Sequence, residues 1–205
     1  MIKYFVRTTN ERKLDKTYAQ IEFTKLVDLE HKPVDSFISQ LKQISEYDSV
    51  LLEDDLILCK DFKNKIEEAI SKYPNYVINF FYMPMNYTTT HVANTVFRFN
   101  QCTYYPKGIS KLIADEMEKL YKTDRFGYAV IEDEAIQKLN LVFVIYRPCL
   151  IQHIGKFSLL KGKERYLRQT IYFDDYLDEL GITYDEAYKY KDDLLKLLEE
   201  RNKSL

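Results

Sequence analysis

Strand-like and helix-like segments alternate over the first 150 residues, and this alternation most constrains the fold. The strand-like segments are apolar and β-branched, and the helix-like segments carry apolar residues at a spacing of three or four. The strand-like segments are residues 2–7, 49–58, 76–83, 94–106 and 141–148. The helix-like segments are residues 33–47, 60–74, 107–122 and 131–139. This order predicts an α/β domain with a largely parallel sheet, in which ligands bind at the carboxyl ends of strands.

The last forty residues follow a different pattern. Thr183 and Glu186 have the spacing of a capping box, and a long charged helix is expected to follow them. We therefore divide the chain into a main domain, residues 1–165, and a C-terminal helical extension, residues 166–205. The leucines of this helix favour packing on the main domain or on a second subunit; they are Leu194, Leu195, Leu197 and Leu198.

The composition is that of an ordinary soluble globular protein. Of the 205 residues, 46% are hydrophobic, which is enough for a full core, and the net charge of −2 does not favour nonspecific binding to nucleic acid. No apolar run reaches the length of a signal peptide or a membrane span. Cys59, Cys102 and Cys149 are far apart and set in apolar surroundings, so we expect buried free thiols and a cytoplasmic location.

Three consecutive carboxylates interrupt the apolar run "VLLEDDLILC" at Glu53, Asp54 and Asp55. Burying like charges side by side costs several kcal/mol, roughly, unless a cation or hydrogen-bond donors compensate. Carboxylate oxygens suit Mg²⁺ or Mn²⁺, and such ions often bridge to substrate phosphates. The triplet is therefore either a metal-diphosphate site at the end of a strand or a solvated acidic turn.

A late polar segment, "CLIQHIGKFSLLKGK", offers a second set of groups. His153 follows an apolar run and is a possible ligand of Mn²⁺, and Lys161 and Lys163 could meet phosphate charge. The alternative for His153 is a hydrogen-bonded residue of the core.

Two further features lie at predicted helix starts. Glu132, Asp133 and Glu134 follow an apolar approach, where a carboxylate could act as a general base or complement the helix dipole. Gly108 lies in a loop before a helix, where a glycine permits either close approach to a ligand or a turn.

In this order, "EDD" at 53–55, "YYPKG" at 104–108, "IED" at 131–133 and "QHIG" at 152–155 resemble the motifs of metal-dependent glycosyltransferases of GT-A fold. The segments "LIQHIGKFSLLKGK" and "LLEDDLILCKDF" resemble those of the N-acetylglucosaminyltransferase IV group. The segment "TYYPKGISKLI" is similar to that of lipooligosaccharide-type glycosyltransferases. The resemblance covers about residues 2–163.

The resemblance implies a GT-A (Rossmann-like) fold with a mixed, mostly parallel sheet flanked by helices, a Mn²⁺ or Mg²⁺ cofactor and a nucleotide-sugar donor. The implied metal ligands are Glu53, Asp55 and His153, although an EDD motif does not by itself select among its carboxylates. The implied catalytic base is Asp133, with Glu132 beside it, and direct displacement would invert the anomeric centre. The implied donor contacts are Arg7, Thr8, Thr9, Asp54, Gly108, Lys161 and Lys163.

Two other functions fit part of the same pattern. A metal-dependent nucleotidyl or phosphoryl transferase also needs clustered carboxylates and phosphate-facing lysines, although the chain has no Walker A or GxGxxG motif. A non-catalytic glycosyltransferase-like protein would bind a partner through its aromatic surface and C-terminal helix.

The acceptor is predicted to be a glycan or a hydroxymethylated DNA base. DNA would call for a basic face, and one segment could supply it, with Lys156, Lys161, Lys163, Arg165 and Arg168. Aromatic residues could stack on the acceptor or simply pack in the core; they are Tyr82, Tyr87 and Tyr104.

Overall fold

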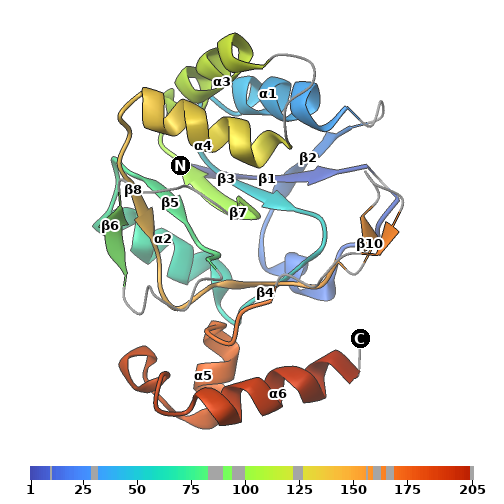
Figure 1. The fold of residues 1–205 in the computed structure, drawn as a ribbon, viewed down its shortest axis with the longest axis vertical. Coiled ribbons are helices and arrows are strands. Elements are labelled where there is room, and N and C mark those ends of the chain that lie inside the picture. The colour runs from blue at the N-terminus through green and yellow to red at the C-terminus, as the bar shows by residue number, and fades with distance from the viewer. Residues whose placement is uncertain are drawn as a thin grey trace.

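A seven-stranded mixed sheet forms the centre of the computed structural model (Figure 1). The described residues are 1–9, 11–28, 32–82, 90–93, 100–121, 127–155, 157–158, 163–164 and 169–203. In spatial order the strands are β2 (Phe23–Val27), β1 (Ile2–Thr8), β3 (Asp48–Glu53), β7 (Cys102–Tyr105), β5 (Val77–Asn79), β8 (Phe143–Ile145) and β6 (His91–Ala93). Only β7 and β6 run antiparallel to their neighbours. The predicted α/β class with a mostly parallel sheet is confirmed.

Helices cover both faces of the sheet because alternate side chains of each strand point to opposite sides. On one face, Phe5 and Leu51 pack with α1 (Pro33–Gln43), α3 (Ile109–Leu120) and α4 (Tyr128–Lys138). On the other face, Val6 and Leu52 pack with α2 (Phe62–Lys72) and with the C-terminal segment. Figure 1 shows these layers above and below the sheet.

The acidic triplet lies at the end of a strand, as predicted, but a second strand follows it. Residues 49–58 form two strands, because the chain bends at Asp54 and Asp55 and leaves the main sheet. After the bend, β4 (Leu56–Leu58) pairs with β9 (Ile151–His153) in a small antiparallel sheet. A second small sheet joins β10 (Phe157–Ser158) to β11 (Lys163–Glu164).

The C-terminal segment differs from the single long helix that the sequence predicts. The capping box of Thr183 and Glu186 is present, but it caps a short 3₁₀ helix, η2 (Tyr184–Glu186). The long helix, α6 (Lys191–Lys203), begins later, and α5 (Asp174–Leu180) precedes both. Tyr172, Phe173 and Leu194 of this segment belong to the same hydrophobic core as β1 and β3.

The three cysteines are buried and free, as predicted. Among the described residues, no helix combines the length and the apolar character that crossing a membrane requires.

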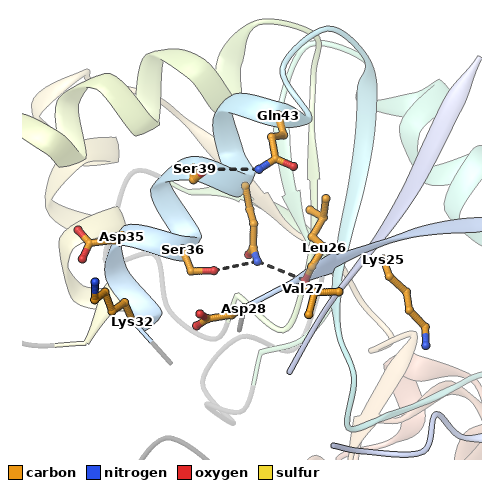
Figure 2. Close-up of a pocket in the computed structure, with 10 residues that line it drawn as sticks. Lys25, Leu26, Val27, Asp28, Lys32, Asp35, Ser36, Ser39 and Gln43 are labelled. Carbon is orange, nitrogen blue, oxygen red and sulfur yellow. Dashed lines mark hydrogen bonds between the residues drawn. The ribbon is translucent and has the colours of Figure 1, made fainter. Parts of the chain in front are cut away.

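A pocket of about 390 Å³ lies between the carboxyl end of β2 and α1 (Figure 2). Its lining is polar and includes Asp28 after β2 and Ser36 and Ser39 of α1. Buried Gln40 forms the inner wall, where its amide donates to the Leu26 carbonyl (3.3 Å) and to Ser36 Oγ (3.0 Å).

Candidate metal centre

The acidic triplet lies at a topological switch point of the sheet. β2 pairs with β1 on one side, and β3 pairs with β1 on the other side, so that the chain changes direction of travel across the sheet at β1. In the pair of β1 and β3, Arg7 lies opposite Glu53. The crevice outside the carboxyl ends of two such strands is the usual ligand site in an open α/β sheet. The Glu53 amide donates to the Gln101 carbonyl (3.0 Å), which fixes the strand end at this crevice.

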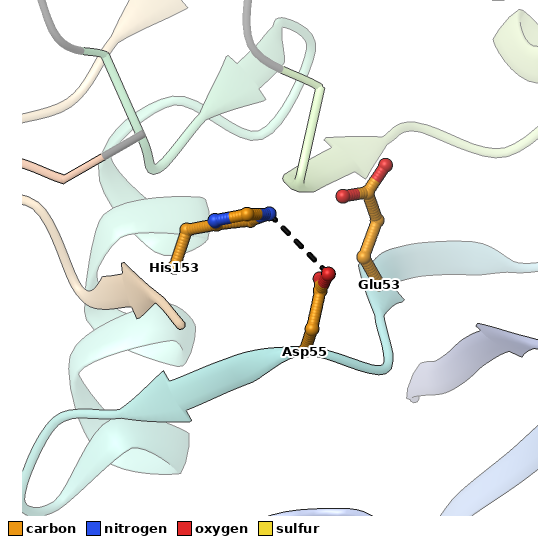
Figure 3. Close-up of side chains that lie close together, drawn as sticks. All are labelled: Glu53, Asp55 and His153. Carbon is orange, nitrogen blue, oxygen red and sulfur yellow. Dashed lines mark ion pairs between the residues drawn. The ribbon is translucent and has the colours of Figure 1, made fainter. Parts of the chain in front are cut away.

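The small sheet brings His153 to the same place. Leu56 of β4 is opposite His153 of β9, and the Ile154 amide donates to the Asp55 carbonyl (2.9 Å). His153 Nε2 consequently lies 3.4 Å from Asp55 Oδ2. Figure 3 shows Glu53, Asp55 and His153 converging from β3, the bend and β9, and their ligand atoms lie within 4.8 Å of one another. We call these three residues the metal triad.

The metal triad has the donor set and the unmet bonding capacity of a divalent cation site. Two carboxylates and an imidazole suit Mn²⁺, and the carboxylates suit Mg²⁺. Asp55 and His153 are each 10% exposed. Asp55 Oδ1 and His153 Nδ1 are buried without a hydrogen-bond partner among the described residues. Buried polar atoms are normally bonded, so the residues present fit a metal ion.

Asp55 is held in its ionised form. Burial alone would raise the pKa of its carboxyl group. The neighbouring His153 imidazole and Arg12 guanidinium outweigh burial and hold the pKa below its ordinary value. A carboxylate that is already ionised can bind a metal without first losing a proton.

Gly155 leaves room for the Asp55 carboxylate. A Cβ atom built on Gly155 would fall on Asp55 Oδ2 and 3.1 Å from the His153 ring. The glycine of the "QHIG" segment is therefore required by close approach to the metal triad.

Arg12 belongs to the site, although it was not among the predicted site residues. Its Nη1 lies 3.2 Å from Asp54 Oδ1 and also contacts Asp55 Oδ2. A single arginine in a polar loop has no periodicity or motif, so only the folded structure shows this contact. Asp54 was predicted to bind the donor, and in the structure its carboxylate forms an ion pair with this guanidinium.

Arg7 supports the site from the interior. Its guanidinium lies between the rings of Phe37 and Tyr128, 4.4 Å from each centroid, and its Nε donates to Gln40 Oε1 (2.9 Å). Its Nη1 forms an ion pair with Glu53 Oε1 at 3.8 Å, and Tyr128 Oη donates a hydrogen bond to the same oxygen (2.6 Å). The structure thus places Arg7 behind Glu53 as a positioning residue, rather than at the open edge where donor contact was predicted.

Thr8 and Thr9 lie at the end of β1, at the same edge as the metal triad. The Thr8 carbonyl accepts a hydrogen bond from the Asp28 amide (2.9 Å). Thr9 Oγ1 is buried and has no hydrogen-bond partner among the described residues. Their position is compatible with the predicted donor contact.

The two predicted base residues have different surroundings. α4 begins at Tyr128, so Glu132 and Asp133 lie in its second turn and not in the predicted first turn. Glu132 is fully buried and accepts from Tyr105 Oη (2.5 Å) and Asn100 Nδ2 (2.7 Å). Burial raises the pKa of Glu132 to about 7, although both hydrogen bonds act to lower it. Asp133 is half-buried and accepts from Gln137 one turn later (3.0 Å).

Gly108 was predicted to contact the donor, but the structure places it away from the metal triad. β7 runs antiparallel to β3, so the loop after β7 lies at the opposite end of β3 from Glu53. The Gly108 amide donates to the Ser45 carbonyl (2.9 Å), and its φ of +85° fits the turn before α3. Tyr104 also belongs to that end, where its hydroxyl donates to Asp48 (3.1 Å), so its hydroxyl lies away from the metal triad.

A second acidic cluster has a different explanation. Cys59, Asp174 and Asp175 have ligand atoms within 4.8 Å of one another. However, the Lys65 ammonium group contacts Asp174, and the Lys60 amide donates to Asp175 (2.7 Å). The cluster therefore joins α2 to α5 with a cation supplied by the chain.

The remaining predicted residues are only partly described. Lys161 and Tyr87 lie outside the described residues, as do Lys156, Arg165 and Arg168. Lys163 is described only as backbone paired with Ser158, and Tyr82 is buried. No protein-family model matches the chain, and no curated protein is significantly similar to it in sequence.

Proposed function

We propose that this protein is a metal-dependent glycosyltransferase of GT-A type, which moves a sugar from a nucleotide-sugar donor to an acceptor hydroxyl. The observation that carries the proposal is the metal triad, with unmet buried ligand atoms at the switch point of a largely parallel sheet. The predicted strand-end acidic motif and the predicted late histidine meet there. Their meeting supports the resemblance that the sequence suggests.

The chemistry follows from the charges at this edge. When bound, Mn²⁺ or Mg²⁺ would offset the negative charge that develops on the leaving diphosphate. Glu53, Asp55 and His153 would hold that ion, and the hydroxyl of Tyr128 together with Arg7 would fix the Glu53 carboxylate. The acceptor oxygen would form a bond to the anomeric carbon as the bond from that carbon to the diphosphate breaks. The acceptor proton would pass to a carboxylate base, and direct displacement would invert the centre.

Asp133 and Glu132 remain the two proposed bases, and they differ in how accessible they are. The pKa of Glu132 is about 7, near the value that suits a general base, but the side chain is sealed in the interior. Asp133 is the more accessible of the two.

The pocket between β2 and α1 is proposed to take the nucleoside of the donor. It lies at the carboxyl edge of the sheet, two strand spacings from β3, which is about 10 Å. Gln40 of its inner wall bonds Arg7, which in turn lies beside Glu53.

Thermal unfolding against a panel of nucleotide sugars, with and without Mn²⁺, tests the proposal. A ligand that binds only the folded state at a hundredfold excess over its Kd stabilises it by about 2.7 kcal/mol. For a chain of this size, that corresponds to a rise in Tm of roughly 5–10 °C. We expect such a rise with one nucleotide sugar, only in the presence of Mn²⁺.

Two variants make the result specific. Asp55→Asn removes the central ligand and should abolish the rise, whereas Asp192→Asn, an exposed carboxylate on α6, should retain it. A rise with nucleoside triphosphates alone would favour the nucleotidyl or phosphoryl transferase. A rise that persists in Asp55→Asn would refute the metal triad.

A further inference from the structure

Arg12 lies between the solvent and the carboxylates of the site. It belongs to the loop between β1 and η1 (Lys16–Gln20), and its side chain is 24% exposed. The Asp54 and Asp55 side chains that it contacts are only 8% and 10% exposed. Its guanidinium therefore covers two buried carboxylates from the outside.

Arg12 and His153 approach the same oxygen atom. Arg12 Nη1 contacts Asp55 Oδ2, and His153 Nε2 lies 3.4 Å from that atom. A divalent ion held by the metal triad would share Asp55 with the guanidinium at close range, where two positive charges repel strongly in a low-dielectric site. The present position of Arg12 and an occupied metal triad therefore disfavour each other.

We propose that Arg12 is an exchangeable counter-ion of this site, which pairs with Asp54 and Asp55 without metal and transfers to the donor diphosphate when metal binds. The inference rests on the proposed function. A guanidinium presents the same planar fork to a carboxylate and to a phosphate, so the side chain can exchange one partner for the other. The metal takes over the carboxylate with which Arg12 was paired. The diphosphate then offers the guanidinium a new anionic partner.

The exchange gives Arg12 opposite effects on two ligands. Removing the guanidinium removes a competitor of the metal, so Arg12→Ala should bind Mn²⁺ alone several-fold more tightly. The same variant lacks a charge-assisted bond to the diphosphate, so the Mn²⁺-loaded protein should bind inorganic pyrophosphate roughly 10- to 100-fold more weakly. A residue with only a structural role would change both affinities in the same direction.

The experiment uses the full chain and two titrations. Electron paramagnetic resonance of free Mn²⁺ reports metal binding, and calorimetry reports pyrophosphate binding to the Mn²⁺-loaded protein. Arg12→Lys retains the charge without the fork, so it should keep the wild-type Mn²⁺ affinity within a few-fold and lose most of the pyrophosphate affinity. Lys13→Ala removes one exposed charge from the same loop and should leave both affinities within about two-fold. Circular dichroism establishes that each variant is folded.

The outcomes separate this inference from the proposed function. Suppose that the wild type binds Mn²⁺ through Asp55. If Arg12→Ala then lowers the affinity for both Mn²⁺ and pyrophosphate, or changes neither affinity, the exchange is refuted and the metal triad stands. If Arg12→Ala fails to fold, Arg12→Lys decides, and unchanged pyrophosphate affinity there overturns the exchange. A wild type that leaves the free Mn²⁺ signal unchanged overturns both proposals.

Discussion

At the scale of single residues, Gly155 is, among the glycines in the described part of the chain, the one where an added Cβ atom would meet other residues. In Gly155→Ala the new methyl group would overlap the Asp55 carboxylate, and the carboxylate or the His153 ring must shift. Overpacking of this kind costs about 1–3 kcal/mol. We expect Mn²⁺ affinity to fall by roughly 10- to 100-fold while the far-ultraviolet circular dichroism stays unchanged.

Gly127→Ala is the matched control, because a Cβ atom there meets nothing within 4 Å and the glycine φ of −62° suits alanine. Mn²⁺ affinity in this variant should equal that of the wild type. If Gly155→Ala also bound Mn²⁺ normally, the triad geometry described above would be wrong.

Glu132 makes stability depend on pH. Its pKa rises from 4.5 to about 7 on folding because its carboxyl group is buried. The folded state therefore favours the protonated carboxyl, and its contribution to stability is full below about pH 4.5 and is lost as the pH rises to about 7. Glu132→Gln mimics the protonated form, so it should be more stable than the wild type at pH 8, by up to about 3 kcal/mol.

The advantage of Glu132→Gln should shrink toward zero at pH 4.5, as urea unfolding at several pH values would show. Tyr105 can still donate to the amide oxygen, and a flip of the Asn100 amide can accept from the new NH₂ group. Glu67→Gln, an exposed site on α2, should show no such pH dependence. An advantage that is equal at both pH values would contradict the raised pKa.

At the scale of elements, the pocket between β2 and α1 can be tested separately from the metal triad. Ser39 is exposed on the pocket side of α1, so Ser39→Trp should fill the pocket. We expect the affinity for the nucleotide sugar to fall at least about tenfold, with unchanged Mn²⁺ affinity, as measured by calorimetry. Lys63→Trp, exposed on α2 at the other face of the sheet, should change neither. Normal donor binding by Ser39→Trp would place the nucleoside elsewhere.

Periodicity predicted most of the main layers, but it missed the edge strand β2 (Phe23–Val27) and the breaks within the layers. The strand and helix segments before residue 150 follow their apolar spacing, because each buries one face against the sheet. The acidic triplet was predicted to end its strand, and β3 does end at Glu53. The second strand, Leu56 to Leu58, could not be predicted, because it depends on pairing with β9. The capping box at Thr183 was visible, but the 3₁₀ geometry that follows it depends on packing.

The site was predictable only where a motif marked it. The carboxylates and His153 were found from motifs that resemble a known family. Arg12 was missed because its partners lie in the bend after β3, far from it in the sequence. Gly108 was misplaced because local residue spacing does not reveal the direction of β7.

At the scale of the whole molecule, the C-terminal segment and the sheet share one hydrophobic core. Leu194 of α6 is fully buried there, so Leu194→Ala should destabilise the entire chain by about 2–5 kcal/mol. We expect a single unfolding transition, shifted to lower denaturant concentration, in a fluorescence-monitored urea titration. Leu195→Ala removes a neighbour that is 37% exposed and should cost much less. Two separate transitions in Leu194→Ala would show that the extension unfolds on its own.

The pairing of β4 with β9 also sets the moment during synthesis at which a binding site can exist. Glu53 and Asp55 leave the ribosome long before His153, and nothing holds the bend against an imidazole until β9 has been made and paired. Nascent chains or proteolytic fragments that stop before β9 would carry two of the three ligands on an unpaired β4 edge. Tight Mn²⁺ binding would then serve as a signal that the chain has finished folding.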